Sequence, residues 1–202
     1  GQPWPEASVA LVQWQHQGLV EEDDAGTFRF VDPGLARAFR QHNDDALRSR
    51  WHRAALDYWQ SAAERGVEGA SEHIAHHALA CGDDELAAGA YLEVANEAQR
   101  CHRPVAVDSA CVQVLDALGD ARGELAQRAL LGRGWAAYRM DRAAEAAELL
   151  QRAADLARER GAWEEECWCL LERCTALDWA QRFDDAATAM KALDARRGER
   201  EL

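Results

Sequence analysis

The chain has 202 residues, of which 48% are hydrophobic and four are proline, so it can bury a core and disorder is not expected. Its 36 acidic and 23 basic residues give a net charge of −13, which opposes binding to nucleic acid and to anionic membranes. No stretch approaches the roughly 20 apolar residues of a membrane-spanning helix, and the N-terminus does not have the pattern of a signal peptide. We therefore expect a cytoplasmic protein that is helical nearly throughout.

A short helix, a β-hairpin and a second helix are predicted in the first 36 residues. Apolar residues recur at helical spacing from residue 9, and Gly18 marks the end of this helix. Ala25-Gly26 is a turn signal beside the strand-forming Phe28, and Pro33 opens the next helix. Helix, hairpin and helix form the back half of a winged helix, so residues 1–36 are predicted to be a partial winged-helix element.

The charges of this element decide against DNA. Arg29 is the one basic residue between Gly1 and Gly34, and the same stretch holds six acidic residues: Glu6, Glu21, Glu22, Asp23, Asp24 and Asp32. A wing of this kind would point carboxylates at phosphates. We expect a structural wing that packs on neighbouring domains.

From residue 37 onward the sequence predicts helix after helix. Residues 37–83 are predicted to be linking helices or a degenerate repeat, and residues 84–202 to hold regular repeats. Three windows align on Ala106, Ala146 and Ala186, which lie 40 residues apart twice in succession. A fixed period of helix, turn and helix predicts an all-α solenoid of helical hairpins with a period of about 40 residues.

The segment "GWAAYRMDRAAEAAELLQRAADL" resembles a tetratricopeptide repeat (TPR). Small Gly134, small Ala146, large Leu150 and small Ala153 stand at the spacing of that family. Asp141 stands where the turn glycine is usual, and the helices are longer than the standard 34-residue unit implies. The resemblance covers roughly residues 84–196.

This resemblance implies a binding groove lined by the first helix of each pair. The family's exposed positions, the second, fifth, ninth and twelfth of the unit, fall here on eight residues: Arg128, Leu131, Trp135, Tyr138, Trp168, Leu171, Thr175 and Asp178. Aromatic rings beside an arginine suit a binding hot spot. The alternative interpretation is that both tryptophans fill the space between helices.

The order of the parts resembles the C-terminal half of STAND-type signal-transduction ATPases and of kinase-linked regulators in bacteria. A winged-helix remnant precedes "RSRWHRAALDYWQ", then "HIAHHALACGDDELAAGAYLEVANEA", then long repeats. The resemblance implies an upstream nucleotide-binding domain and a sensor or partner-binding arm in the repeats. Because the chain begins with Gly1, we expect a piece of a longer protein. Its one lysine, Lys191, is followed by Ala192, so a phosphate-binding Gly-Lys-Ser/Thr motif is absent from the sequence.

No catalytic motif stands out, and we expect neither an enzyme nor a cofactor. The sequence contains no G-x-S-x-G, no HExxH and no dinucleotide-binding loop. His73, His77 and Cys81 lie at i, i+4 and i+8, a spacing that can start a metal site, whereas His76 falls off this stripe. The set has no separated second pair of ligands, so we favour helix packing and expect no metal.

The sequence is therefore interpreted as the sensor and interaction arm of a larger bacterial signalling protein. It would bind a protein or peptide partner, or a small effector, and contact an upstream ATPase domain. Nucleic acid and membranes are not expected partners. A self-association scaffold is the first alternative, and a fragment of a DNA-binding transcriptional regulator is the second.

Overall fold

The structure is a computed structural model, and it describes residues 5–22, 28–42, 44–119 and 122–200. This part of the chain contains ten helices and one two-stranded hairpin, so the predicted largely helical fold is confirmed. Within it, no helix combines the length and the apolar character needed to cross a membrane. The chain divides into two compact units, residues 1–51 and 52–202, with the boundary inside the span predicted to link the winged element to the repeats.

The first unit has the predicted order of helix, hairpin and helix. It comprises α1 (Pro5–His16), β1 (Val20–Glu22), β2 (Phe28–Phe30), α2 (Pro33–His42) and the start of α3 (Asp45–Glu64). The strands are antiparallel, with Val20 opposite Phe30, and the Phe30 ring lies 6.2 Å from that of Trp14. The predicted turn at Ala25-Gly26 lies outside the described residues.

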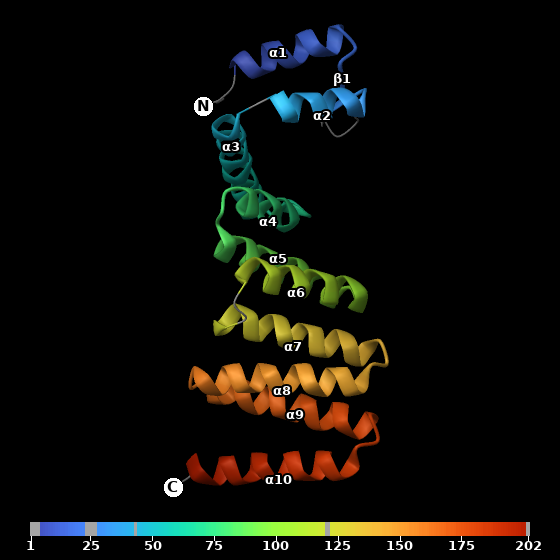
Figure 1. Cartoon of the computed structure of the whole chain (residues 1–202), viewed down its shortest axis with the longest axis vertical. Helices are drawn as coiled ribbons and strands as arrows, with labels where there is room; N and C mark the ends of the chain where they lie inside the picture. The colour runs from blue at the N-terminus through green and yellow to red at the C-terminus, as the bar shows by residue number, and fades with distance from the viewer. Residues whose placement is uncertain (1–4, 23–27, 43, 120–121, 201–202) are drawn as a thin grey trace. The chain divides into compact units, whose positions relative to one another are not determined.

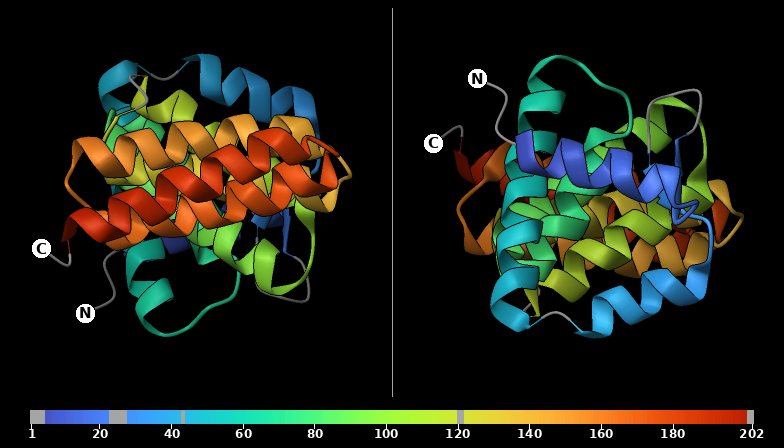
Figure 2. Two further views of the ribbon diagram at one scale, coloured as in Figure 1. Left: turned by 90° about the horizontal axis from the view of Figure 1, so that it is seen from below. Right: turned by 90° about the horizontal axis from the view of Figure 1, so that it is seen from above.

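The second unit continues along α3 and stacks helix on helix in chain order, as Figure 1 shows. Its remaining helices are α4 (Ala70–Ala80), α5 (Asp84–Arg100), α6 (Pro104–Leu118), α7 (Gly123–Arg139), α8 (Ala143–Glu159), α9 (Trp163–Trp179) and α10 (Phe183–Arg200). Viewed along the stack, α8, α9 and α10 run side by side (Figure 2). The first residues of α5, α7 and α9 are 84, 123 and 163, which are 39 and then 40 residues apart.

The turns inside the three helical hairpins share one conformation. His102, Asp141 and Gln181 follow α5, α7 and α9 and have φ angles of 53°, 62° and 58°. This left-handed region is one that glycine adopts without steric cost and other residues rarely adopt. Asp141 therefore takes the backbone conformation that a turn glycine would supply.

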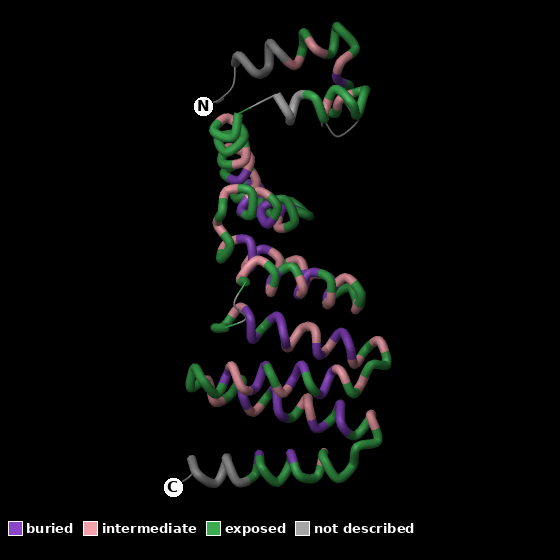
Figure 3. The backbone as a smooth tube through the Cα atoms, viewed as in Figure 1, coloured by how far each residue is buried: buried purple, intermediate pink, exposed green. Residues whose placement is uncertain are grey.

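Small residues allow the helices of the second unit to approach closely. A Cβ atom at Gly134 would lie 2.7 Å from Cγ of Leu150, and one at Gly132 would lie 2.8 Å from Sγ of Cys111. Ala146 and Ala153 are fully buried in the same core. Figure 3 shows buried residues recurring from α5 to α9, whereas most of residues 183–194, the part of α10 whose burial is described, are exposed. The six cysteines are free thiols, of which Cys111, Cys169 and Cys174 are buried and Cys101 is exposed.

The 40-residue alignment slips by one position in its first window. Because α5 and α7 begin 39 residues apart, the structural equivalent of Ala146 is Val107, which is fully buried, and not the half-buried Ala106. Between α7 and α9 the spacing is 40 residues, as aligned. The slip matters because it moves every residue assigned to the first repeat, α5 and α6, onto a neighbouring face of its helix.

Candidate functional site

The first helices of the three hairpins, α5, α7 and α9, surround a cavity of about 200 Å³. Helix α5 contributes two apolar residues and two amides to its lining, α7 an arginine and three apolar or small residues, and α9 an indole and a carboxylate, while α6 and α8 contribute three further apolar residues. These residues are Leu92, Ala95, Asn96, Gln99, Val107, Cys111, Arg128, Leu131, Gly132, Trp135, Leu150, Trp168 and Glu172. A cavity with an apolar wall and a few polar groups suits an inserted side chain.

Two further cavities join the first one through shared lining residues. A cavity of about 300 Å³ shares Arg128, Leu131 and Trp168 with it. Another, of about 530 Å³ between α9 and α10, shares Glu172 and is also lined by Phe183 and Met190. We call this continuous surface the α5–α7–α9 groove.

Seven of the eight sequence-predicted groove residues line these cavities. Arg128, Leu131, Trp135 and Trp168 surround the central cavity, and three others line the cavity next to α10: Leu171, Thr175 and Asp178. The side chain of Trp168 is 57% exposed, while Trp135 is half-buried against the α5–α6 core. Neither tryptophan is therefore fully buried. That these residues bind a partner stays a prediction.

Tyr138 is the eighth predicted groove residue. Its ring packs edge to face on Trp179, with ring centroids 5.9 Å apart and an interplanar angle of 86°. Trp179 is 66% exposed. The pair joins the ends of α7 and α9 and extends the aromatic surface beyond the cavities named above. The repeat spacing assigns the neighbouring Asp178 to the groove and passes over Trp179.

Sequence reasoning also missed the residues that α5 contributes. Asn96 and Gln99 line the central cavity and lie 39 residues before Trp135 and Tyr138. A 39-residue offset would have identified them, whereas the 40-residue offset points to Ala95 and Ala98, which are buried. The two amides supply hydrogen-bond donors and acceptors that can hold a peptide backbone.

The groove is predominantly acidic. Arg128 is the basic residue of its lining, against five carboxylates: Glu124, Glu164, Glu165, Glu172 and Asp178. Glu124 lies 3.9 Å from Arg128, and Glu165 pairs with Arg160 at 2.9 Å. Because acidic walls attract positive charge, the groove favours a basic partner over an acidic one.

Buried polar contacts beneath the groove connect α7, α8 and α9. Nε2 of Gln127 donates to Sγ of Cys169 at 3.7 Å, and its Oε1 accepts from Arg160 at 3.1 Å. Glu166 is buried and accepts from Nε of Arg158 at 2.8 Å, and this hydrogen bond raises the pKa of Arg158 above its ordinary value. Such satisfied buried contacts fix the relative positions of the helices that carry the cavity.

His73, His77 and Cys81, whose spacing could start a metal site, are not brought together. His73 instead stacks on Trp59, with ring centroids 3.9 Å apart and planes 8° from parallel. His77 approaches His52 of the preceding helix, and Cys81 is half-buried at the end of α4. In the described part of the chain, the residues that could share a metal ion are His52, His76 and His77. Sequence reasoning passed over His76. It could not place His52 near His77, because only the packing of α3 against α4 brings the two residues together.

Comparisons with protein-family models, with curated proteins and with solved structures find no match to this chain.

Proposed function

We propose that the chain is a protein-interaction arm that binds a peptide segment of a partner in the α5–α7–α9 groove. The observation that carries the proposal is the central cavity, where half-exposed Trp168 and Trp135 stand beside Arg128 and the amides of α5. Aromatic residues and arginine at the centre of a surface are typical of binding hot spots. Binding, rather than catalysis, is the role that this set of side chains supports.

The chemistry of the lining specifies the class of peptide. The cavity of about 200 Å³ accepts one aromatic or branched aliphatic side chain, and the carboxylates around it favour lysine or arginine on either side. The amides Asn96 and Gln99 suit the peptide's own backbone. The proposed ligand is therefore an apolar residue flanked by basic residues, presented by a partner protein or by another domain of the same protein.

The resemblance to STAND-type ATPases supports a place for this arm in a larger cytoplasmic signalling protein of a bacterium. In this proposal the arm contacts an upstream ATPase domain. A peptide that binds one arrangement of the arm more tightly than another would shift the equilibrium between the two arrangements. The free energy of this shift cannot exceed the difference between the two binding free energies. Tetratricopeptide-type packing of the helical pairs is part of the same proposal, supported by Gly134 against Leu150 and by the equivalent turns.

Selection from a random peptide library displayed on phage tests the groove directly. We expect enriched peptides with an apolar residue between basic ones, and weaker binding as salt is raised. Trp168→Ala should weaken the best peptide about 30-fold, equivalent to about 2 kcal/mol. Tyr58→Ala is the matched control, because Tyr58 is also exposed but lies on α3. Peptides that bind wild-type protein and Trp168→Ala equally would contradict the proposal.

Self-association is a second candidate, and the exposed end of the stack favours it. Phe183 and Met190 of α10 are 60% and 41% exposed and line one cavity beside α9, and a contiguous apolar surface can mark a contact with another protein. Sedimentation between about 1 and 200 µM would show a mass that rises with concentration and falls back in Phe183→Ser. A constant monomer mass would exclude this role.

The DNA-regulator alternative is not favoured by any described contact. Arg29, the basic residue of the hairpin, lies opposite Glu21 and pairs with it at 2.6 Å. Its charge is therefore already offset within the wing. Absence of DNA binding stays a prediction, and salt-sensitive DNA affinity tighter than roughly micromolar would contradict it.

A further inference from the structure

The pairing of α3 with α4 places histidines of both helices at one point. Gly66 and Gly69, both with φ near 76°, reverse the chain so that α4 packs against α3. His52 precedes the buried Leu56 by one helical turn, and His77 lies beside the buried Ala78. The faces that form the apolar contact between the helices therefore also carry these imidazoles.

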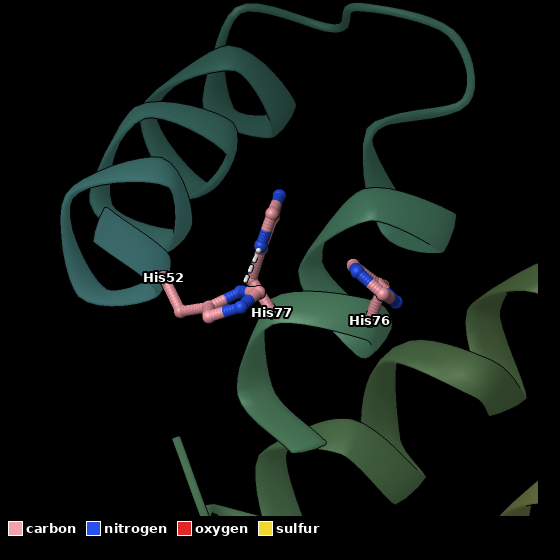
Figure 4. Close-up of side chains that lie close together, drawn as sticks. All are labelled: His52, His76 and His77. Atoms are coloured by element: carbon pink, nitrogen blue, oxygen red, sulfur yellow. Dashed lines mark hydrogen bonds between the residues drawn. The ribbon is translucent and has the colours of Figure 1, made fainter. Parts of the chain in front are cut away.

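The rings are close enough to share an ion. Nδ1 of His52 lies 2.9 Å from Nδ1 of His77, and their ring centroids are 5.2 Å apart. The His76 ring lies 5.9 Å from that of His52 and 5.0 Å from that of His77. One nitrogen from each ring falls within 4.8 Å of the others. Figure 4 shows His52 extending from one helix toward His77 on the next, with His76 beside it.

We propose that His52, His76 and His77 bind one divalent transition-metal ion of the zinc type, with the fourth position open to water. Three imidazoles and one open position make a familiar tetrahedral arrangement for zinc. With metal–nitrogen bonds of about 2.0 Å, ligand nitrogens lie about 3.3 Å apart. The His52–His77 pair would open slightly and the exposed His76 ring would move inward, which side-chain rotation allows.

The electrostatic environment supports this assignment. The pKa of His77 is lowered to about 4, first by burial and then by the neighbouring rings of His76, His52 and His73. His77 is therefore neutral at physiological pH, the form in which imidazole coordinates a metal. A neutral His77 ring beside two further imidazoles is better suited to a metal ion than to a proton.

The competing explanation is a hydrogen bond between two neutral rings. A separation of 2.9 Å suits an N–H donor on one ring and an acceptor nitrogen on the other, with no ion involved. In that case zinc would bind no better than it does to scattered surface histidines. Zinc affinity and its dependence on individual histidines separate the two explanations.

The test is a zinc titration of the full chain, expressed without a histidine tag and freed of metal by a chelator. Zinc chloride at pH 7.5 should bind at one equivalent with a dissociation constant of micromolar or tighter. His52→Gln, His76→Gln and His77→Gln should each weaken binding at least tenfold. His73→Gln is the matched control on the same helix and should bind as wild type, because His73 stacks on Trp59.

Cobalt(II) provides a second measurement that needs no variant. Tetrahedral coordination gives visible absorption, and ligation by nitrogen alone leaves no thiolate charge-transfer band in the ultraviolet. The absence of saturable one-to-one binding at tens of micromolar zinc would overturn the proposal. So would zinc affinity that depends on His73 or Cys81, or that is unchanged in all three histidine variants.

Discussion

Helices α7 and α8 meet through small residues, whereas α3 and α4 meet through aromatic and imidazole rings. Gly134 admits the Leu150 side chain against the α7 backbone, and buried alanines fill the rest of that contact. Between α3 and α4, Trp59 lies on His73 and His52 lies against His77. The comparison indicates two uses of a helical pair. A tightly packed pair can bind a partner only through side chains on its outer face, whereas a pair joined by rings can hold a metal ion between its helices.

The largest expected effect comes from removing a buried side chain of the tightly packed pair. Leu150→Ala should lower the free energy of unfolding by about 3 kcal/mol, because it removes buried apolar contact and leaves a cavity. Leu171→Ala is the matched control, since Leu171 is 43% exposed on α9, and it should cost less than about 1 kcal/mol. Urea unfolding measures both. Equal losses would mean that the α7–α8 contact is not close-packed.

Glycine substitutions examine the same contact with the opposite change in volume. Gly134→Ala should destabilise the chain by about 1–2 kcal/mol, because the new Cβ would overlap Leu150. Gly89→Ala, in α5, should instead stabilise it by about 0.5 kcal/mol, because nothing lies within 4 Å and alanine favours helix. Thermal unfolding of the two variants compares them. A stabilising Gly134→Ala would refute the close approach of these helices.

The ring-joined pair should be the one that responds to acid. His77 keeps its lowered pKa of about 4 only when folded, whereas the unfolded side chain takes up a proton near pH 6.5. The contribution of neutral His77 to the free energy of unfolding is thus fully present above pH 6.5. It decreases as the pH drops toward 4 and changes no further below that pH. Because water screens the partly exposed ring, we expect a loss of about 1 kcal/mol.

The difference in unfolding free energy between wild type and His77→Gln isolates this contribution, measured from pH 7 to pH 4 with a chelator present. The variant serves as its own control, since both proteins share all other titrating groups. A difference that stays constant across that range would show that His77 is not shielded between the helices.

The smallest expected effect concerns the turns of the repeated hairpins. Gln181→Gly should raise stability by about 0.5 kcal/mol, because relief of the cost of a left-handed backbone outweighs the extra conformational freedom that glycine loses on folding. Gln113→Gly, at an exposed position inside α6, should lower it by about 1 kcal/mol. Opposite signs in chemical denaturation would support the equivalence of the turns. A loss of stability in both variants would argue against it.

Local signals in the sequence predicted much of this architecture. Gly18 and Pro33 bounded the first helices, and small residues such as Gly134 and Ala146 marked the positions where helices approach. The groove positions on α9 followed from those on α7, because the spacing between these helices is 40 residues. Asn96 and Gln99 were missed, since a one-residue change of spacing moves every assignment to another face of the helix.

The contacts between side chains of different helices could not be derived in this way. The packing of Tyr138 on Trp179 depends on where α7 and α9 end relative to each other. The approach of His52 to His77 depends on how the segment around Gly66 returns α4 to α3. Helical periodicity fixes which residues share a face of one helix, but tertiary packing decides which faces meet.

The most direct test of the binding groove is the response of the tryptophan indole N–H signals when a library-selected peptide is added. Nuclear magnetic resonance resolves these signals residue by residue, and the eight tryptophans are distributed from Trp4 to Trp179. The account predicts that the signals of Trp135 and Trp168 shift in proportion to the bound fraction, while that of Trp59 does not. Saturable peptide binding that leaves Trp135 and Trp168 unchanged would contradict it.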